Sequence, residues 1–145
     1  MKVIFQNLSK QYKGKYALKD FSTELHEGVY GLLGANGAGK TTLINLFVGI
    51  LPSDGGRVLI DGNDAKELGR DFLSQIGYMP QYPVFYKDFT VMDFLLYMSA
   101  LKGIPAGEGK ERSLELLKIV NLLDARDKKI GTLSGGMRQR VGIVQ

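Results

Sequence analysis

Residues 34–42, read as Gly-Ala-Asn-Gly-Ala-Gly-Lys-Thr-Thr, restrict the possible folds of this chain more than any other stretch. The apolar run before them, residues 29–33, is predicted to be a strand buried on both faces. Residues 41–51 have the apolar spacing of a helix, which Pro52 is expected to end. The pattern G-x-x-x-x-G-K-[ST] is satisfied by Gly34, Gly39, Lys40 and Thr41. The stretch therefore predicts a phosphate-binding loop between a strand and a helix.

The chemistry of such a loop explains its residue types. Glycines let consecutive backbone N–H groups turn into one concavity without Cβ clashes, and the following helix adds partial positive charge at its N-terminus. Lys40 is predicted to reach the β- and γ-phosphates of a nucleotide, and the Thr41 hydroxyl to bind Mg²⁺, which prefers oxygen ligands. The predicted nucleotide contacts of the loop are Gly34, Asn36, Gly37, Ala38, Gly39, Lys40, Thr41 and Thr42.

The amino-acid composition narrows the classes of protein to which this chain can belong. Of the 145 residues, 44% are hydrophobic and 23% charged, which is typical of a globular domain. The absence of cysteine excludes disulfides and thiolate metal sites. The net charge of +4 is spread along the chain and has no basic run typical of nucleic-acid arms. The most apolar stretch, residues 91–101, is too short to span a bilayer, so any link to a membrane is expected to go through a partner.

Other periodic stretches predict a mixed α/β chain. Strands are predicted at residues 3–7, 16–25, 57–62 and 76–81, with the first two in a hairpin around Lys13–Gly14. Helices are predicted at residues 90–103 with Thr90 as N-cap, at 110–123 after a loop over 104–109, and at 133–145 after a Ser-Gly-Gly cap. The expected division is an α/β core that contains the glycine-rich loop, with a β subdomain, over 1–87, a helical subdomain over 88–132, and the start of a final helix over 133–145.

The stretch Leu133-Ser134-Gly135-Gly136-Met137, followed by Arg138-Gln139-Arg140, resembles the signature motif of the ATP-binding cassette (ABC) ATPases. The family form more often has Gln at position 137. The glycine-rich loop 34–42 precedes this motif along the chain, as it does in the family, and the resemblance runs from the first residues to the last. It implies a P-loop NTPase core with an N-terminal antiparallel β subdomain and a helical subdomain. It also implies that Ser134, Gly135 and Gly136 close over the γ-phosphate bound to a second subunit.

Two further residues fit the family pattern. Gln81 resembles the Q-loop glutamine, which would contact Mg²⁺ and the attacking water and sense a transmembrane partner; taken alone, it is an exposed loop amide. Tyr12 resembles the A-loop aromatic residue that stacks on adenine, with Tyr16 as its rival and a plain strand tyrosine as the simpler interpretation. The resemblance thus implies Lys40 and Gln81 as catalytic residues, and Thr41 and Gln81 at the metal.

Several family elements are expected to lie beyond these residues. In the family, a Mg²⁺-binding carboxylate, a catalytic glutamate and a switch histidine follow the signature helix. The acidic strand end at 58–61 does not match, because Gly62 stands where the glutamate belongs, and His26 precedes the loop and is expected at the surface. We therefore expect an N-terminal piece without the C-terminal core strands. By itself it is expected to be marginally stable, self-associating or differently arranged near its C-terminus, and to hydrolyse hardly any ATP.

The resemblance implies the ATP-binding subunit of an ABC transporter, with ATP and Mg²⁺ as cofactors. The expected partners are a second ATP-binding subunit and transmembrane permease subunits, with no nucleic acid, and the expected location is cytoplasmic, at the inner face of the cell membrane. The aromatic segment 82–89 is interpreted either as part of a groove for the membrane subunit or as a packed loop. A soluble ABC-type ATPase acting on ribosomes or nucleic acid, and a non-hydrolysing nucleotide-binding module, remain alternatives.

Overall fold

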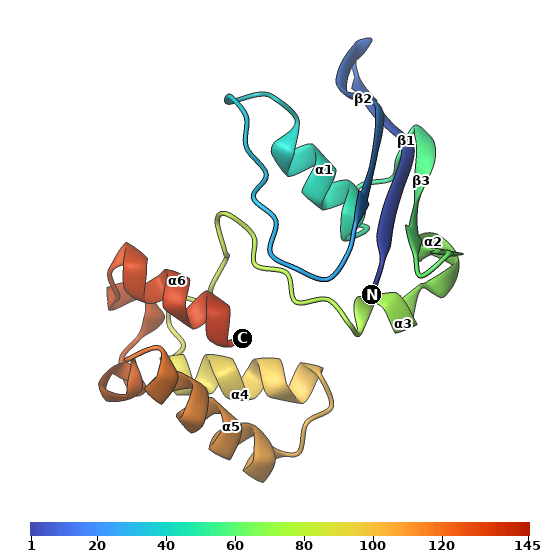
Figure 1. The fold of residues 1–145 in the computed structure, drawn as a ribbon. Helices are drawn as coiled ribbons and strands as arrows, with labels where there is room; N and C mark the ends of the chain where they lie inside the picture. Colours follow the sequence, from blue (N-terminus) through green and yellow to red (C-terminus); the bar gives the residue numbers. More distant parts are fainter. The chain divides into compact units, whose positions relative to one another are not determined.

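The structure is a computed structural model that describes residues 1–145, and these form two units, Met1–Tyr78 and Met79–Gln145 (Figure 1). Each unit is described by itself. The three-part division expected from the sequence stays a prediction.

An antiparallel sheet dominates the first unit. The predicted hairpin is confirmed, because Lys13 and Gly14 both have positive φ angles, 48° and 81°, as a tight two-residue turn requires. The strands lie in the order β2-β1-β3-β4. Their bounds are Val3–Tyr12 (β1), Lys15–Leu25 (β2), Gly55–Ile60 (β3) and Asn63–Asp64 (β4).

Helix α1, Lys40–Phe47, packs its apolar side against this sheet. It ends four residues before the predicted position 51, because Gly49 adopts the left-handed conformation (φ 76°) just past the C-cap residue Val48. Two single-turn helices follow β4, α2 (Ala65–Leu68) and α3 (Arg70–Leu73). The buried core of the unit consists of Val3, Phe5, Leu8, Leu43, Leu46, Val58, Ile60 and Phe72.

Two predicted strands are absent. Neither residues 29–33 nor residues 76–81 form a strand, and neither pairs with any of the four strands. Val29 and Leu33 are 103% and 91% exposed, so the prediction of a strand buried on both faces is wrong for this structure. The physical reason is that a strand is held by ladder hydrogen bonds to a neighbour, which local apolar sequence cannot supply.

The second unit is helical. Its helices are α4 (Val91–Leu101), α5 (Ala106–Ile119) and α6 (Gly135–Val144), with 3₁₀ turns η1 (Leu123–Ala125) and η2 (Ile130–Thr132). The predicted N-cap of α4 is confirmed as a capping box, in which the Thr90 and Asp93 side chains accept hydrogen bonds from each other's backbone N–H groups. The buried core comprises Val91, Phe94, Leu95, Leu117, Leu122, Ala125, Ile130, Leu133, Val141 and Val144.

Helix α5 begins earlier than the sequence suggests. Residues 106–109 belong to its first turn, so the prediction of a loop over 104–109 is wrong in this part. Gly109 is buried, and a Cβ there would lie 2.9 Å from the Cβ of Ser99 in α4. The glycine is therefore needed for close approach of α4 and α5. None of the helices is both long and apolar enough to cross a membrane.

Candidate functional site

The glycine-rich loop forms a turn that leads directly into α1. The amide of Ala38 donates to the carbonyl oxygen of Ala35 at 3.2 Å, and Gly37 and Gly39 adopt left-handed conformations with φ of 83° and 89°. Residues 34–38 are exposed, so no side chain of the unit covers the loop apart from that of Lys40. The loop therefore presents its backbone to solvent.

Lys40 folds back over this loop. Its Nζ donates to the carbonyl oxygens of Gly34 at 2.6 Å and of Ala35 at 2.8 Å. The ammonium has no carboxylate partner, so its positive charge stays at the loop. Both bonds are to neutral acceptors, which an anionic phosphate oxygen would outcompete because charge-assisted hydrogen bonds are stronger.

The N-terminus of α1 adds to the positive character of the loop. No side chain caps this helix, and its first turn contains no acidic residue. Thr41 is exposed there and Thr42 is half-buried. The partial positive charge of the helix end is therefore available to an anion, and the Thr41 hydroxyl is accessible as an oxygen ligand.

Two tyrosines remain candidates for stacking on a base. Tyr12 ends β1 and is 46% exposed, while Tyr16 in β2 is 51% exposed. Each has a lysine over its ring, since Lys10 Nζ lies 5.8 Å from the Tyr12 centroid and Lys19 Nζ 5.4 Å from that of Tyr16. The preference for Tyr12 stays a prediction.

Asp54 holds the end of β1 through a set of hydrogen bonds, called the Asp54 clamp below, which was not predicted from the sequence. The Asp54 carboxylate accepts from Lys10 Nζ at 2.8 Å and from the Gln11 amide at 2.7 Å, while the Asp54 amide donates to the Ser9 carbonyl oxygen at 3.0 Å. The hydrogen bond from Lys10, followed by that from Gln11, holds the pKa of Asp54 below its ordinary value. The clamp fixes the strand end that carries Tyr12. Its only sequence signal was an aspartate in the turn before β3.

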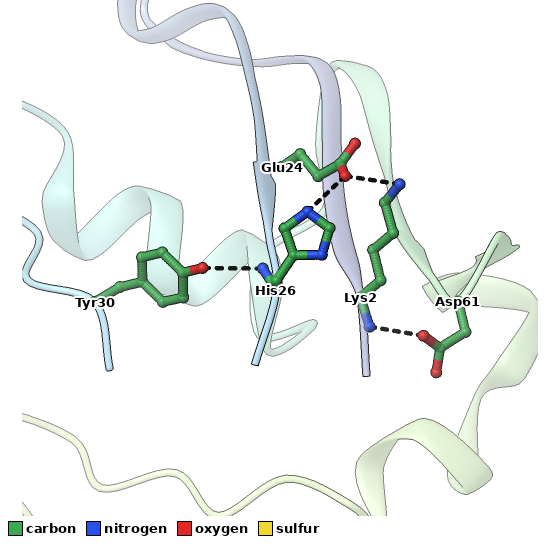
Figure 2. A network of polar contacts seen from close by, with 5 residues as sticks. All are labelled: Lys2, Glu24, His26, Tyr30 and Asp61. Carbon is green, nitrogen blue, oxygen red and sulfur yellow. Dashed lines mark hydrogen bonds and ion pairs between the residues drawn. The ribbon is translucent and has the colours of Figure 1, made fainter. Parts of the chain in front are cut away.

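A second polar network lies at the other end of the sheet (Figure 2). The Glu24 carboxylate accepts from Lys2 Nζ at 2.7 Å and lies 2.9 Å from His26 Nε2, and Lys2 is the larger cause of the lowered pKa of Glu24. The Tyr30 hydroxyl accepts from the His26 amide at 3.0 Å. His26 is 66% exposed, so its prediction as a surface residue is confirmed. The bond to Tyr30 ties the segment before the glycine-rich loop to the end of β2.

The Ser-Gly-Gly sequence caps α6 as predicted. The Ser134 Oγ accepts from the Met137 amide at 3.3 Å, which leaves the hydroxyl hydrogen free to donate elsewhere. A Cβ at Gly135 or Gly136 would meet nothing within 4 Å. The backbone N–H groups at the start of α6 are therefore accessible, and the first turn of α6 contains no acidic residue.

Gln81 lies close to this surface within the second unit. It is exposed, in a segment without regular secondary structure. A cavity of about 360 Å³ is lined by Gln81, Tyr82, Pro83, Val84, Phe85, Lys87, Ile130, Gly135, Arg138 and Gln139. The structure thus brings the glutamine and the start of α6 to one cavity. The aromatic segment 82–89 also contributes Tyr86 and Phe89, which pack against Tyr97 of α4, so this segment is partly a packed aromatic cluster.

Arg140 fastens α6 to α5. Its guanidinium donates to the carbonyl oxygens of Val120 at 2.9 Å and Asn121 at 3.4 Å, where α5 ends. A cation at this position also complements the negative end of the helix. The sequence had placed Arg140 only within a motif, without a structural role.

The predicted site residues fall into both units. The loop residues, Tyr12 and Thr41 belong to the first unit, whereas Gln81 and residues 134–136 belong to the second. The chain contains no group of three or more His, Asp or Glu side chains placed to hold a metal.

Comparison with known proteins gives consistent results. Residues 18–145 match the ABC transporter family. The uncharacterized ABC transporter ATP-binding protein YxlF of Bacillus subtilis is 39% identical over 97% of this chain and 46% of its own length. The linearmycin resistance ATP-binding protein LnrL of the same organism is 35% identical, over 95% of this chain and 45% of its length. The chain spans about half the length of these two curated relatives.

Other similarities extend to export proteins and to solved structures. The lipopolysaccharide export system ATP-binding protein LptB of Escherichia coli is 36% identical over 97% of this chain and 60% of its length. A dimeric bacterial ABC transporter cassette superposes with a TM-score of 0.83 at 29% identity, covering 98% of this chain and 67% of that one. CbiO1 of Clostridium perfringens gives 0.79 at 28% identity, covering 98% and 59%. The fold is therefore that of the P-loop NTPase cassettes.

Proposed function

Because this chain belongs to the ABC transporter family of ATP-binding proteins, we propose that the full protein hydrolyses ATP as a dimer and thereby powers transport across a membrane. The observation that carries the proposal is the glycine-rich loop: it is exposed, it leads into an uncapped helix, and its lysine lies bonded only to neutral carbonyl oxygens. These are the features that a polyphosphate requires of a protein surface.

In this proposal the loop holds the phosphates of ATP. Lys40 exchanges the carbonyl oxygens of Gly34 and Ala35 for the β- and γ-phosphate oxygens, and those backbone N–H groups of the loop and of the first turn of α1 that have no partner within the chain donate to the remaining oxygens. The exposed ring of Tyr12 stacks on the adenine. Its position at the end of a strand clamped by Asp54 supports this role, because an ordered ring loses less entropy on binding.

Mg²⁺ is proposed as a cofactor. Within the first unit, Thr41 offers an exposed hydroxyl in the first turn of α1; the amide oxygen of Gln81 is proposed as a second ligand from the resemblance to the family alone. Mg²⁺ prefers such hard oxygen donors and usually shares its ligands with phosphates and water, so few protein ligands are needed. When bound, it would neutralise charge on the phosphate oxygens during transfer. Gln81 would also orient the attacking water.

The signature segment is proposed to act on a second subunit. Ser134 uses its oxygen to cap α6 and keeps its hydroxyl hydrogen free, while Gly135 and Gly136 leave the backbone amides accessible. These donors would bind the γ-phosphate held by loop 34–42 of the opposite subunit. The dimeric form of a similar cassette supports this arrangement.

The remaining partners follow from the family and the relatives. We propose transmembrane permease subunits as partners, with the cavity beside segment 82–89 as part of their docking surface, and a location at the cytoplasmic face of the membrane. The names of relatives support transport over action on ribosomes or nucleic acid, since they include lipopolysaccharide export and Nod factor export proteins.

Equilibrium binding and turnover of Mg·ATP by the full-length protein test the proposal. Lys40→Ala is expected to weaken binding and abolish hydrolysis, because it removes the cation from the phosphates. Lys13→Ala, which removes a lysine from the β1–β2 turn, is the matched control and should leave both unchanged. Full hydrolysis by Lys40→Ala would overturn the proposal.

The isolated residues 1–145 are expected to bind nucleotide weakly and to turn it over hardly at all. They contain no Asp-Glu pair at the end of an apolar strand, and positioning by such groups dominates phosphoryl transfer. Substantial turnover by residues 1–145, sensitive to Lys40→Ala, would contradict this.

A further inference from the structure

Lys10 lies between a carboxylate and an aromatic ring at the end of β1. Its Nζ donates to the Asp54 carboxylate at 2.8 Å and lies 5.8 Å from the centroid of the Tyr12 ring. Held in this way, the lysine side chain is only 11% exposed, whereas Tyr12 is 46% exposed. The ammonium is thus fixed over one face of the ring, within the distance of about 6 Å at which a cation and an aromatic face attract. The rest of the ring is open to solvent.

The strand register shows which face of the sheet carries this pair. Lys10 is opposite Leu18 in the β1–β2 ladder and Tyr12 is opposite Lys15, and residues directly opposite each other share a face. Leu18 packs against the buried core of the unit, and a Cβ at Gly39, the N-cap of α1, would lie 3.9 Å from its Cδ1. The Lys10–Tyr12 pair therefore lies on the face of the sheet that carries α1 and the end of the glycine-rich loop.

The second lysine–tyrosine pair of the hairpin, Lys19 over Tyr16, lies on the opposite face. The register shifts by one residue of β2 after the Lys10 pair, so that Tyr16 is opposite Gln11. Gln11 stands between Lys10 and Tyr12 in β1, and successive side chains of a strand point to opposite faces. The register therefore favours Tyr12 over Tyr16 as the ring beside the glycine-rich loop.

We propose that Lys10, held by Asp54, is a positioning residue for the base of the nucleotide, an inference that rests on the proposed function. The ammonium occupies one face of the Tyr12 ring, so the base stacks on the other face, against a ring that is already restrained and loses less entropy on binding. The cation also draws electron density toward its own side, which lessens the repulsion between the π-electrons of the ring and those of a purine. Asp54 acts on the base through Lys10, and Lys10 acts through Tyr12.

Equilibrium binding of Mg·ATP and of magnesium tripolyphosphate to the full-length protein tests this proposal, because tripolyphosphate presents phosphates without a base. Lys10→Gln should weaken the binding of ATP about two- to fivefold, as expected for loss of a cation over an exposed ring, and leave the binding of tripolyphosphate unchanged. Asp54→Asn should act in the same direction on ATP alone. Lys10→Arg should bind ATP as the unaltered protein does, because a guanidinium also stacks on an aromatic face. Lys19→Gln, which removes the cation over Tyr16, is the matched control and should change neither affinity.

A double-mutant cycle shows whether Lys10 acts through the tyrosine ring. In a Tyr12→Leu background, Lys10→Gln should cause no further loss of ATP binding, since the ring is gone. Unchanged ATP binding by Lys10→Gln, an equal loss in both backgrounds, or an equal loss of ATP and tripolyphosphate binding would overturn the proposal. So would weakened ATP binding by Lys19→Gln. Lys40→Ala should weaken the binding of both ligands, so failure of the phosphate contacts and failure of the base contact can be told apart.

Discussion

Gly39, the N-cap of α1, lies so close to the carbonyl oxygen of Ala17 in β2 that any Cβ at position 39 would collide with it. This contact fixes the start of α1 against the sheet. The left-handed φ of 89° at Gly39 is the second reason why only glycine fits.

The first prediction concerns this contact. Gly39→Ala should lower the free energy of unfolding by about 1–3 kcal/mol, because the backbone must shift as well as adopt an unfavourable conformation. It should also weaken nucleotide binding, since the shift moves the loop. Chemical denaturation and equilibrium binding measure the two effects.

Gly37→Ala is the matched control. Gly37 has nearly the same φ, 83°, but a Cβ there would meet nothing within 4 Å. Its cost should be limited to the conformational preference of glycine, about 1 kcal/mol. If the two variants lowered the free energy of unfolding equally, the close contact between Gly39 and Ala17 would add nothing to the cost of the substitution.

The second prediction concerns pH and the Asp54 clamp. Lys10 and the Gln11 amide lower the pKa of Asp54 in the folded state, so its carboxylate stabilises the fold above its unfolded pKa of about 3.9. This contribution should be lost as pH falls below that value and through the lowered folded pKa. The difference in melting temperature between the unaltered protein and Asp54→Asn should therefore be positive at pH 7 and shrink toward pH 3.

Asp88→Asn serves as the control for this pH series. The Asp88 carboxylate is 98% exposed and lies 4.0 Å from its only cationic neighbour, Lys129. Removing its charge should change the melting temperature little at any pH, because such surface pairs contribute little. A pH-independent difference for Asp54→Asn would contradict the assigned role of its charge.

Features fixed by local chemistry could be predicted from the sequence. The turn at Lys13–Gly14 and the caps at Thr90 and Ser134 depend only on neighbouring residues, and all three are confirmed. The site motifs are equally local, because a phosphate loop needs its glycines and its lysine in consecutive order.

Features that depend on distant partners could not be predicted. Residues 29–33 have the composition of a buried strand but no neighbour to pair with. Gly109 was predicted to lie in a loop over 104–109, yet it belongs to the first turn of α5 and lies close to Ser99 of α4. The clamp at Asp54 and the bond from Arg140 to Val120 likewise join residues whose proximity only the fold determines.

The third prediction concerns Arg140. Arg140→Gln should destabilise the second unit by about 1–2 kcal/mol, because the C-terminal carbonyls of α5 lose a charged donor. Arg140→Lys should recover part of this loss, since it keeps the charge but not the geometry. Denaturation curves measure both, and Arg112→Gln, which removes an exposed arginine of α5, should be nearly neutral. If the Arg140→Gln variant were as stable as the Arg112→Gln variant, the hydrogen bonds from Arg140 to the end of α5 would not be what holds α6.

The fourth prediction separates the two roles assigned to Ser134, the cap of α6 and the contact to phosphate. Ser134→Ala removes both, and should cost about 1 kcal/mol of stability along with ATP hydrolysis. Ser134→Asn keeps an oxygen acceptor for the Met137 amide, so it should retain the stability of the unaltered protein and still lose hydrolysis, because the hydroxyl donor is gone.

Thr90→Ala is the control, because it removes the corresponding cap of α4 and should lower stability without abolishing hydrolysis. Denaturation curves and turnover of Mg·ATP by the full-length variants measure these outcomes. If Ser134→Asn hydrolysed ATP at the original rate, Ser134 would be a helix cap alone, and the clasp across two subunits would have to rest on the amides of Gly135 and Gly136.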